Sequence, residues 1–472
     1  MAGIGFRLQN LLKNDSFISR IKAYSYSAII SSGPWIYSLL SFIVISFFVT
    51  ADIRMHKIFQ VSIIYVFAFS QIIAGIVQLV VTRIISDYIY SGEFGMISTV
   101  YLNSVMALAP LLSVFGIVVF GTTGLGIAYT VISTLLFVLM GLIWIQLIIL
   151  TACRDFRSIS YRFGAGFVIA VVFSLAFGTY LGFSFYFLGF TLGVLYIFMG
   201  MHEQILKEFG EGDRSLVLFR DNGKFKKYGS LFAVGFFFNL GIWIDKLIFW
   251  SAGGGRNVCG LLYENSVYDR LNLIMVVMLI PVMALFTLKV ETNFYVKFRN
   301  FYKSIVEKEN LDSINLNLGL MKRSMLSGAA SILKVVVPLA FVIIVFSDAL
   351  MGGLKLPAEF RVNWIVYTIG SSVHSFLMLS LIMLMYFDFL DDTLRVTMLF
   401  FGLNLFTNVV GIYFFGQKFM GAGYAFSVTA ALALSIYLLK ARIDNLLYFT
   451  FERERISGEI IVDVGGKKEE KK

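Results

Sequence analysis

Twelve apolar stretches occupy almost the whole of this 472-residue sequence. Each has about 20 residues or more, the length at which an α-helix crosses a hydrocarbon core of about 30 Å. The sequence therefore predicts an all-α polytopic membrane protein with about twelve transmembrane helices. The predicted spans lie near residues 24–49, 58–85, 99–121, 123–150, 163–182, 184–205, 229–250, 267–288, 327–347, 362–387, 394–415 and 420–441.

Basic residues are distributed unevenly between the two sides of these spans. With the N-terminus on the cytoplasmic side, thirty of the 39 Lys and Arg lie on that side and seven on the other. Residues at the ends of spans are counted with the nearer side, and only Lys246 and Lys334 lie well inside spans. Because Lys and Arg accumulate in the cytoplasmic loops of membrane proteins, we expect both termini to be cytoplasmic.

A charged segment separates six spans from six, which indicates two six-helix bundles around a central cavity. Both bundles start on the same side of the membrane, so we expect parallel repeats with substrate binding between them. The expected parts are a cytoplasmic amphipathic segment at 1–22, bundles at 23–205 and 229–441, a cytoplasmic linker at 206–228, an amphipathic cytoplasmic loop at 289–326 and a partly disordered cytoplasmic tail at 442–472.

The two amphipathic segments carry apolar residues at helical spacing among basic ones. They favour helices that lie on the inner leaflet as headgroup anchors, with partner docking as the alternative. In the second segment the stripe consists of Val290, Phe294, Phe298, Phe301 and Ile305, and Lys297, Arg299 and Lys303 lie off it.

Composition excludes several classes of protein. A hydrophobic content of 58% and a charged content of 14% exclude an ordinary soluble domain. The net charge of +10 lies in cytoplasmic segments, where lipid headgroups explain it better than nucleic acid does. We expect no metal site and no cofactor, because His56, His202 and His374 are scattered and no nucleotide-binding loop is present.

Charged residues near mid-membrane provide the candidate site. Asp245 and Lys246 in the seventh span are costly in lipid, by about 2.5–3.5 kcal/mol each, so we expect them to face the protein interior or a wet cavity. They are interpreted as contacts for polar substrate or a coupling ion, and the alternative is an ion pair that only fixes helix packing. Further candidates are Trp35, Arg83, Trp243, Glu264, Asp269 and Arg270.

Two N-terminal motifs resemble a known family. Met1-Ala2-Gly3-Ile4-Gly5-Phe6 and Ile30-Ser31-Ser32-Gly33-Pro34-Trp35 are similar to the start of the PelG family, the inner-membrane transporters of Pel exopolysaccharide systems in bacterial biofilms. The resemblance covers residues 1–450. It places the chain in the multidrug/oligosaccharidyl-lipid/polysaccharide exporter superfamily, whose members have two six-helix bundles around a central cavity.

A second motif is similar to the seventh span of polysaccharide flippases. It consists of Ile244-Asp245-Lys246-Leu247-Ile248 followed by Gly260-Leu261-Leu262-Tyr263. The chain departs from that pattern at Phe249-Trp250-Ser251 and in its Gly253-Gly254-Gly255 loop.

The resemblance implies export of an amino-sugar polymer across the bacterial inner membrane. It also implies that the chain functions together with a cytosolic PelF-like glycosyltransferase and with PelD- and PelE-like membrane partners. The alternatives within the superfamily are a lipid-linked oligosaccharide flippase and a cation-coupled drug antiporter. A membrane enzyme is disfavoured by the lack of a large external loop. A scaffold without transport is disfavoured by the charge within a span.

Overall fold

The computed structural model describes residues 36–37, 40–46, 48, 53–153, 156–212, 228–289 and 293–457. In these residues, eleven helices are long and apolar enough to cross a membrane. They correspond to the second to twelfth predicted spans. The predicted first span, at 24–49, lies mostly outside the described residues, as do segment 1–22 and most of 206–228. The predicted all-α membrane fold is confirmed.

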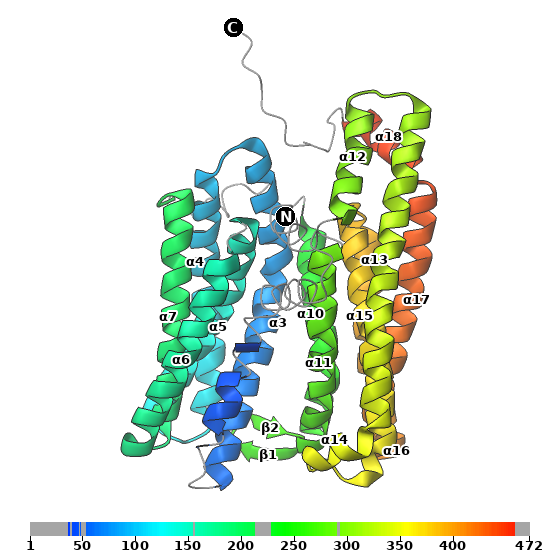
Figure 1. Ribbon diagram of the computed structural model, residues 1–472. Helices are drawn as coiled ribbons and strands as arrows, with labels where there is room; N and C mark the ends of the chain where they lie inside the picture. Colours follow the sequence, from blue (N-terminus) through cyan, green and yellow to red (C-terminus); the bar gives the residue numbers. More distant parts are fainter. Residues whose placement is uncertain are drawn as a thin grey trace, which may run out of the picture.

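The helices form two groups that stand side by side (Figure 1). The N-terminal lobe, as far as it is described, contains α3 (Ile53–Ser91), α4 (Gly95–Gly121), α5 (Ile127–Cys153), α6 (Phe156–Leu181) and α7 (Ser184–Phe209). The C-terminal lobe contains α10 (Gly229–Ser251), α11 (Ser266–Lys289), α12 (Tyr295–Val306), α13 (Leu311–Val345), α14 (Ser347–Gly353), η2 (Ala358–Phe360), α15 (Arg361–Tyr386), α16 (Leu390–Phe415), η3 (Gly416–Phe419), α17 (Ala422–Asp444) and α18 (Leu446–Ser457).

A short antiparallel hairpin adds strands to this helical fold. It joins β1 (Arg256–Cys259) to β2 (Leu262–Glu264) between α10 and α11, and it lies at one end of the molecule beside both lobes (Figure 1). Gly260 at its turn has a φ of 54°, a left-handed conformation that glycine adopts at little cost. A Cβ at this position would also lie 2.6 Å from the backbone of Thr122 in the N-terminal lobe.

The two lobes meet along α3 and α10, whose backbones approach closely at a pair of glycines. A Cβ added to Gly235 would lie 2.2 Å from the carbonyl oxygen of Gly75. A Cβ added to Gly75 would lie 2.2 Å from the amide nitrogen of the Asn239 side chain. Transmembrane helices use small residues in this way because close backbone approach maximises packing where lipid provides no hydrophobic drive.

The helix that contains the ninth predicted span is longer than the span. The sequence predicted 327–347, whereas α13 begins at Leu311. Asn310 caps this helix by accepting a hydrogen bond from the Ser313 backbone N–H at 2.8 Å. Ile314, Leu318 and Met321 then continue its buried stripe. The hydropathy pattern did not reveal this extension because it detects the apolar length that crosses the lipid and not the full length of the helix.

The amphipathic segment predicted at 290–305 forms α12 within its described part. Its apolar stripe contacts the chain itself: the Phe294 ring lies 5.6 Å from that of Tyr386 and 6.2 Å from that of Phe387. Phe301 is fully buried. These contacts attach α12 to the C-terminal end of α15, and α12 and the start of α13 extend beyond the ends of the other long helices (Figure 1).

Candidate functional site

Asp245 and Lys246 lie on α10 with 0% and 1% of their side chains exposed. Adjacent residues on a helix point about 100° apart, so both are buried only where protein surrounds the helix. α10 meets this condition because α3 packs on one side of it and α16 on another. The placement keeps both charges away from lipid, as the cost of charge in hydrocarbon predicts.

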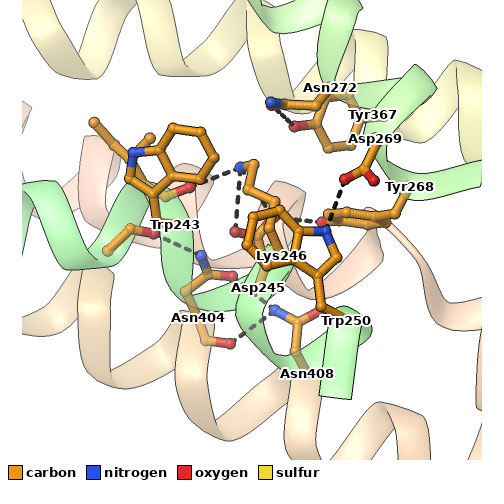
Figure 2. A network of polar contacts seen from close by, with 12 residues as sticks. Trp243, Asp245, Lys246, Trp250, Tyr268, Asp269, Asn272, Tyr367, Asn404 and Asn408 are labelled. Atoms are coloured by element: carbon orange, nitrogen blue, oxygen red, sulfur yellow. Dashed lines mark hydrogen bonds and ion pairs between the residues drawn. The ribbon is translucent and has the colours of Figure 1, made fainter. Parts of the chain in front are cut away.

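The two charges are paired and hydrogen-bonded within the lobe. Lys246 Nζ lies 3.2 Å from Asp245 Oδ1 and donates to the Ile242 carbonyl oxygen at 2.7 Å (Figure 2). Tyr268 donates its hydroxyl to Asp245 Oδ2. The ammonium also lies 5.3 Å from the ring centroid of Tyr424, within the range of a cation–π contact. The centre is therefore a neutral ion pair with most of its hydrogen-bonding capacity used.

Amides and aromatic hydroxyls surround the pair (Figure 2). Asn404 donates to the Gly241 carbonyl oxygen at 2.9 Å, and Asn408 donates to the side-chain oxygen of Asn404 at 2.7 Å. Tyr367 donates to the side-chain oxygen of Asn272 at 2.9 Å. These residues come from α10, α11, α15 and α16, so the polar cluster lies in the interior of the C-terminal lobe.

Some polar atoms of this cluster have no hydrogen-bond partner among the described residues. They include both ring nitrogens of His374, which is fully buried, and Oδ1 of Asn408. The His374 ring stacks on Tyr424 at 5.9 Å between centroids. A buried group without a partner is costly, so the cluster has hydrogen-bonding capacity for water, an ion or a hydroxyl group.

A second group of predicted residues lies at the hairpin end of the molecule. Glu264 of β2 pairs with Lys57 of α3 at 2.5 Å, which links the two lobes. Asp269 accepts a hydrogen bond from Trp250 Nε1 at 2.7 Å. Arg270 donates to the Lys355 carbonyl oxygen at 2.7 Å, within the C-terminal lobe.

Backbone groups of the hairpin reinforce this contact between lobes. Tyr263 donates its N–H to the hydroxyl oxygen of Tyr65 at 2.9 Å, and Leu261 donates its N–H to Thr122 Oγ1 at 3.2 Å. Cys259 Sγ lies 2.8 Å from the Thr123 carbonyl oxygen. The hairpin thus bonds the C-terminal lobe to α3 and to the turn between α4 and α5.

Arg83 lies at the opposite end of α3. Its guanidinium lies 3.4 Å from Asp388, which follows α15 in the C-terminal lobe. Nearby, Tyr228 donates its hydroxyl to Asp87 at 2.5 Å. Charged contacts therefore join the two lobes at both ends of the molecule.

The structure brings only some of the predicted residues together. Asp245, Lys246 and Trp243 share one cluster, and Asp269 joins it through Trp250 (Figure 2). Trp243 also donates to Gln71 of α3 at 3.2 Å and so reaches the other lobe. Glu264, Arg270 and Arg83 lie apart from the pair, and Trp35 lies outside the described residues. A role for any of these residues in substrate contact stays a prediction.

The sequence did not single out the tyrosines and asparagines around the pair. Asn404 and Asn408 offered a usable signal, because two amides four residues apart lie on one face of a span. Tyr268, Tyr367 and Tyr424 offered none among the 23 tyrosines.

Comparisons with known proteins agree with this architecture. Residues 1–451 match the family described as "PelG: Putative exopolysaccharide Exporter (EPS-E)". This match confirms the resemblance seen in the N-terminal motifs. A search of curated proteins found no match.

Solved structures with the same fold are transporters of the MOP superfamily. One, from Pyrococcus furiosus, is described as having a binding pocket of reverse polarity that suggests a different function; it is 12% identical, with a TM-score of 0.61 over 89% of this chain and 96% of that one. A multidrug resistance MATE family transporter also has a TM-score of 0.61. This inward-facing structure is 12% identical over 89% of this chain and 99% of that one. An outward-facing structure of a multidrug resistance MATE family transporter is 13% identical over 91% and 96% of the two chains, with a TM-score of 0.61. At these identities the likeness shows the fold alone.

We predict that the charges of the buried pair are needed for export beyond their effect on folding. Asp245→Asn or Lys246→Met alone leaves one buried charge unpaired and should lower the free energy of unfolding by about 3–5 kcal/mol. The double variant removes both charges and should recover most of this loss, while secretion stays impaired. Membrane abundance, thermal unfolding and secreted polysaccharide are measured in the same cells.

The matched control is the partly exposed ion pair of Lys322 and Asp444, separated by 3.5 Å, whose removal should change little. Normal secretion by the double variant would show that the pair only fixes helix packing. Unchanged secretion in both single variants would exclude any role in transport.

Proposed function

Because this chain belongs to the PelG family of exopolysaccharide exporters, we propose that it carries an amino-sugar polysaccharide of the Pel type across the bacterial cytoplasmic membrane. The observation that carries the proposal is the family match, which extends over both lobes. The polymer passes without chemical change, so the chain acts as a transporter and not as an enzyme. The polar cluster around Asp245 and Lys246 supplies hydrogen-bonding groups suited to sugar hydroxyl and amide groups.

The contacts between the lobes support a route that opens first at one end and then at the other. The hairpin contact with Lys57 and Thr123 closes one end, and the contact between Arg83 and Asp388 joins the lobes at the other. A polymer that passes between the lobes requires each contact to separate. The glycine contact between α3 and α10 lies between the two ends and keeps the lobes together during this movement.

The proposed topology has both termini in the cytoplasm. It rests on the distribution of Lys and Arg, and it puts the hairpin outside and the contact of Arg83 with Asp388 inside. Single cysteines at Lys303 and at Arg256 should react with an impermeant thiol reagent from inside and from outside, respectively, in a background without Cys153 and Cys259. Reaction at position 303 in intact cells would refute the topology.

Locking the hairpin end tests whether this contact must open. Thr123→Cys places a second thiol beside the native Cys259, whose sulfur already touches the Thr123 backbone. In a Cys153→Ser background, oxidation should form a disulfide and stop secretion, and a reductant should restore it. The control is the same variant with Cys259→Ser, which should secrete under both conditions. Full secretion by fully cross-linked protein would show that export does not need this end to open.

A cytosolic PelF-like glycosyltransferase is the proposed source of the polymer, with PelD- and PelE-like proteins as membrane partners. The proposed docking surface is segment 206–228 together with α12 and the start of α13. The support for it is that α12 and this part of α13 extend beyond the ends of the other long helices of the C-terminal lobe (Figure 1).

Charge reversal tests this surface. Lys303→Glu, Lys308→Glu and Arg323→Glu change exposed side chains of α12, its following turn and α13. Combined with reversal of Lys224, Lys226 and Lys227, they should reduce co-purification of the glycosyltransferase at least about tenfold, since interface charges of the wrong sign cost several kcal/mol. Reversal at Lys355 and Arg361, at the other end of the lobe, is the control. A complex that stays intact in the six-fold variant would overturn this surface.

A further inference from the structure

Lys334 occupies an unusual position on the surface of the C-terminal lobe. It lies on α13, eleven residues after Arg323 and fourteen before Asp348. At a rise of about 1.5 Å per residue, these polar positions are about 17 Å and about 21 Å away along the helix. Lys334 therefore lies near the middle of the apolar part of α13.

The side chain of Lys334 faces away from the protein. It is exposed, whereas Ile332 and Val336 on the opposite side of α13 are buried at 0% and 1%. The packing neighbours of α13 are α11, α12, α14 and α15, all within its own lobe. Among the described residues, no carboxylate or other hydrogen-bonding group pairs with the Lys334 ammonium.

Residues at alternating spacings of three and four form one face around Lys334, here called the outer face of α13. All of them are exposed, and Val337 and Phe341 are 54% and 66% exposed. The outer face consists of Ser327, Ala330, Lys334, Val337 and Phe341. This spacing is that of a helix packed against another at a shallow angle, and small residues such as Ser327 and Ala330 favour close approach in membranes.

A lysine facing lipid at this depth has a high free energy. A charge at the centre of a span costs about 2.5–3.5 kcal/mol even on insertion scales. Lysines near helix ends reduce this cost by reaching the headgroups, but Lys334 lies seven residues, about 10 Å, from the start of its span at residue 327, beyond the length of its four-carbon stem. An acidic side chain at the same depth would remove the cost by forming an ion pair.

We propose that the outer face of α13 binds a transmembrane helix of a partner protein that carries one Asp or Glu near mid-membrane, opposite Lys334. A second copy of this chain does not fit the site. In a two-fold dimer through this face, the two Lys334 side chains would meet at the same depth with like charge. The inference requires only that the chain spans a membrane, so it stands or falls independently of the proposed export.

The test uses a defined probe in place of an unidentified partner. The full-length chain carries a photoreactive amino acid at Ala330 and is co-expressed with a single-span Leu/Ala helix containing a central Glu. The matched probe contains Gln at the same position. Interhelical polar contacts in membranes are worth about 1–2 kcal/mol, so the Glu probe should cross-link about 5- to 30-fold more than the Gln probe.

Variants at position 334 test whether the preference for the Glu probe over the Gln probe depends on the charge of Lys334. Lys334→Met should abolish the preference for Glu, and Lys334→Arg should retain it. A photoreactive residue at Val168, exposed on α6 of the other lobe, should cross-link both probes equally. Equal cross-linking of the two probes at Ala330, or a Glu preference that survives in Lys334→Met, would overturn the proposal.

The same cross-linker in native membranes tests the natural occupant. The adduct should contain a membrane protein with an Asp or Glu within a span, and it should disappear when that acid is changed to Asn or Gln. Replacing Lys334 by Glu and the partner's acid by Lys should restore it. An adduct formed only with lipid would show that Lys334 reaches the headgroups and would refute a protein partner.

Discussion

The packing of α10 against both lobes is the interaction on which the rest of the structure depends. On one side Gly235 contacts the backbone of α3, and on another Gly241 lies against the Phe400 ring and receives a hydrogen bond from Asn404 of α16. Because protein covers α10 on these sides, the helix can carry charge at a depth where lipid would oppose it. The same helix leads directly into the hairpin, so the buried polar cluster and the contact between lobes are parts of one continuous segment.

The sequence predicted the interior position of Asp245 and Lys246 but not their mutual arrangement. The energetic cost of charge in hydrocarbon was enough to place them away from lipid. Whether the Lys246 side chain extends toward the headgroups or folds back depends on the backbone carbonyl four residues earlier and on the side chains of the neighbouring helices. In the structure it bends back to the Ile242 carbonyl oxygen and under Tyr424. Such information belongs to tertiary packing, which one sequence does not contain.

The helical spans were predictable because a bilayer offers no hydrogen bonds to an exposed backbone, so apolar length and helix formation coincide there. Outside the apolar region, hydropathy no longer predicts where a helix begins or ends. The early start of α13 depends on the Asn310 cap and on contacts with α12, and the hairpin depends on a turn at Gly260 that fits against Thr122. Glu264 and Arg270 are close in sequence yet make different contacts, because the chain changes from strand to helix between them.

The contacts that join the lobes differ in how they respond to dissolved ions. At the hairpin end, neutral groups such as the Tyr263 N–H, the Leu261 N–H and the Thr123 carbonyl provide most of the described bonds. At the other end, Arg83 and Asp388 are 34% and 30% exposed, and charges with such access to solvent are screened over about 8 Å at physiological ionic strength. In the proposed topology, the hairpin faces surroundings whose salinity the cell does not control. Beside the ion pair of Lys57 with Glu264, closure on that side thus rests on bonds that salt does not screen, whereas the contact between Arg83 and Asp388, which rests on charge alone, lies in the regulated ionic strength of the cytoplasm.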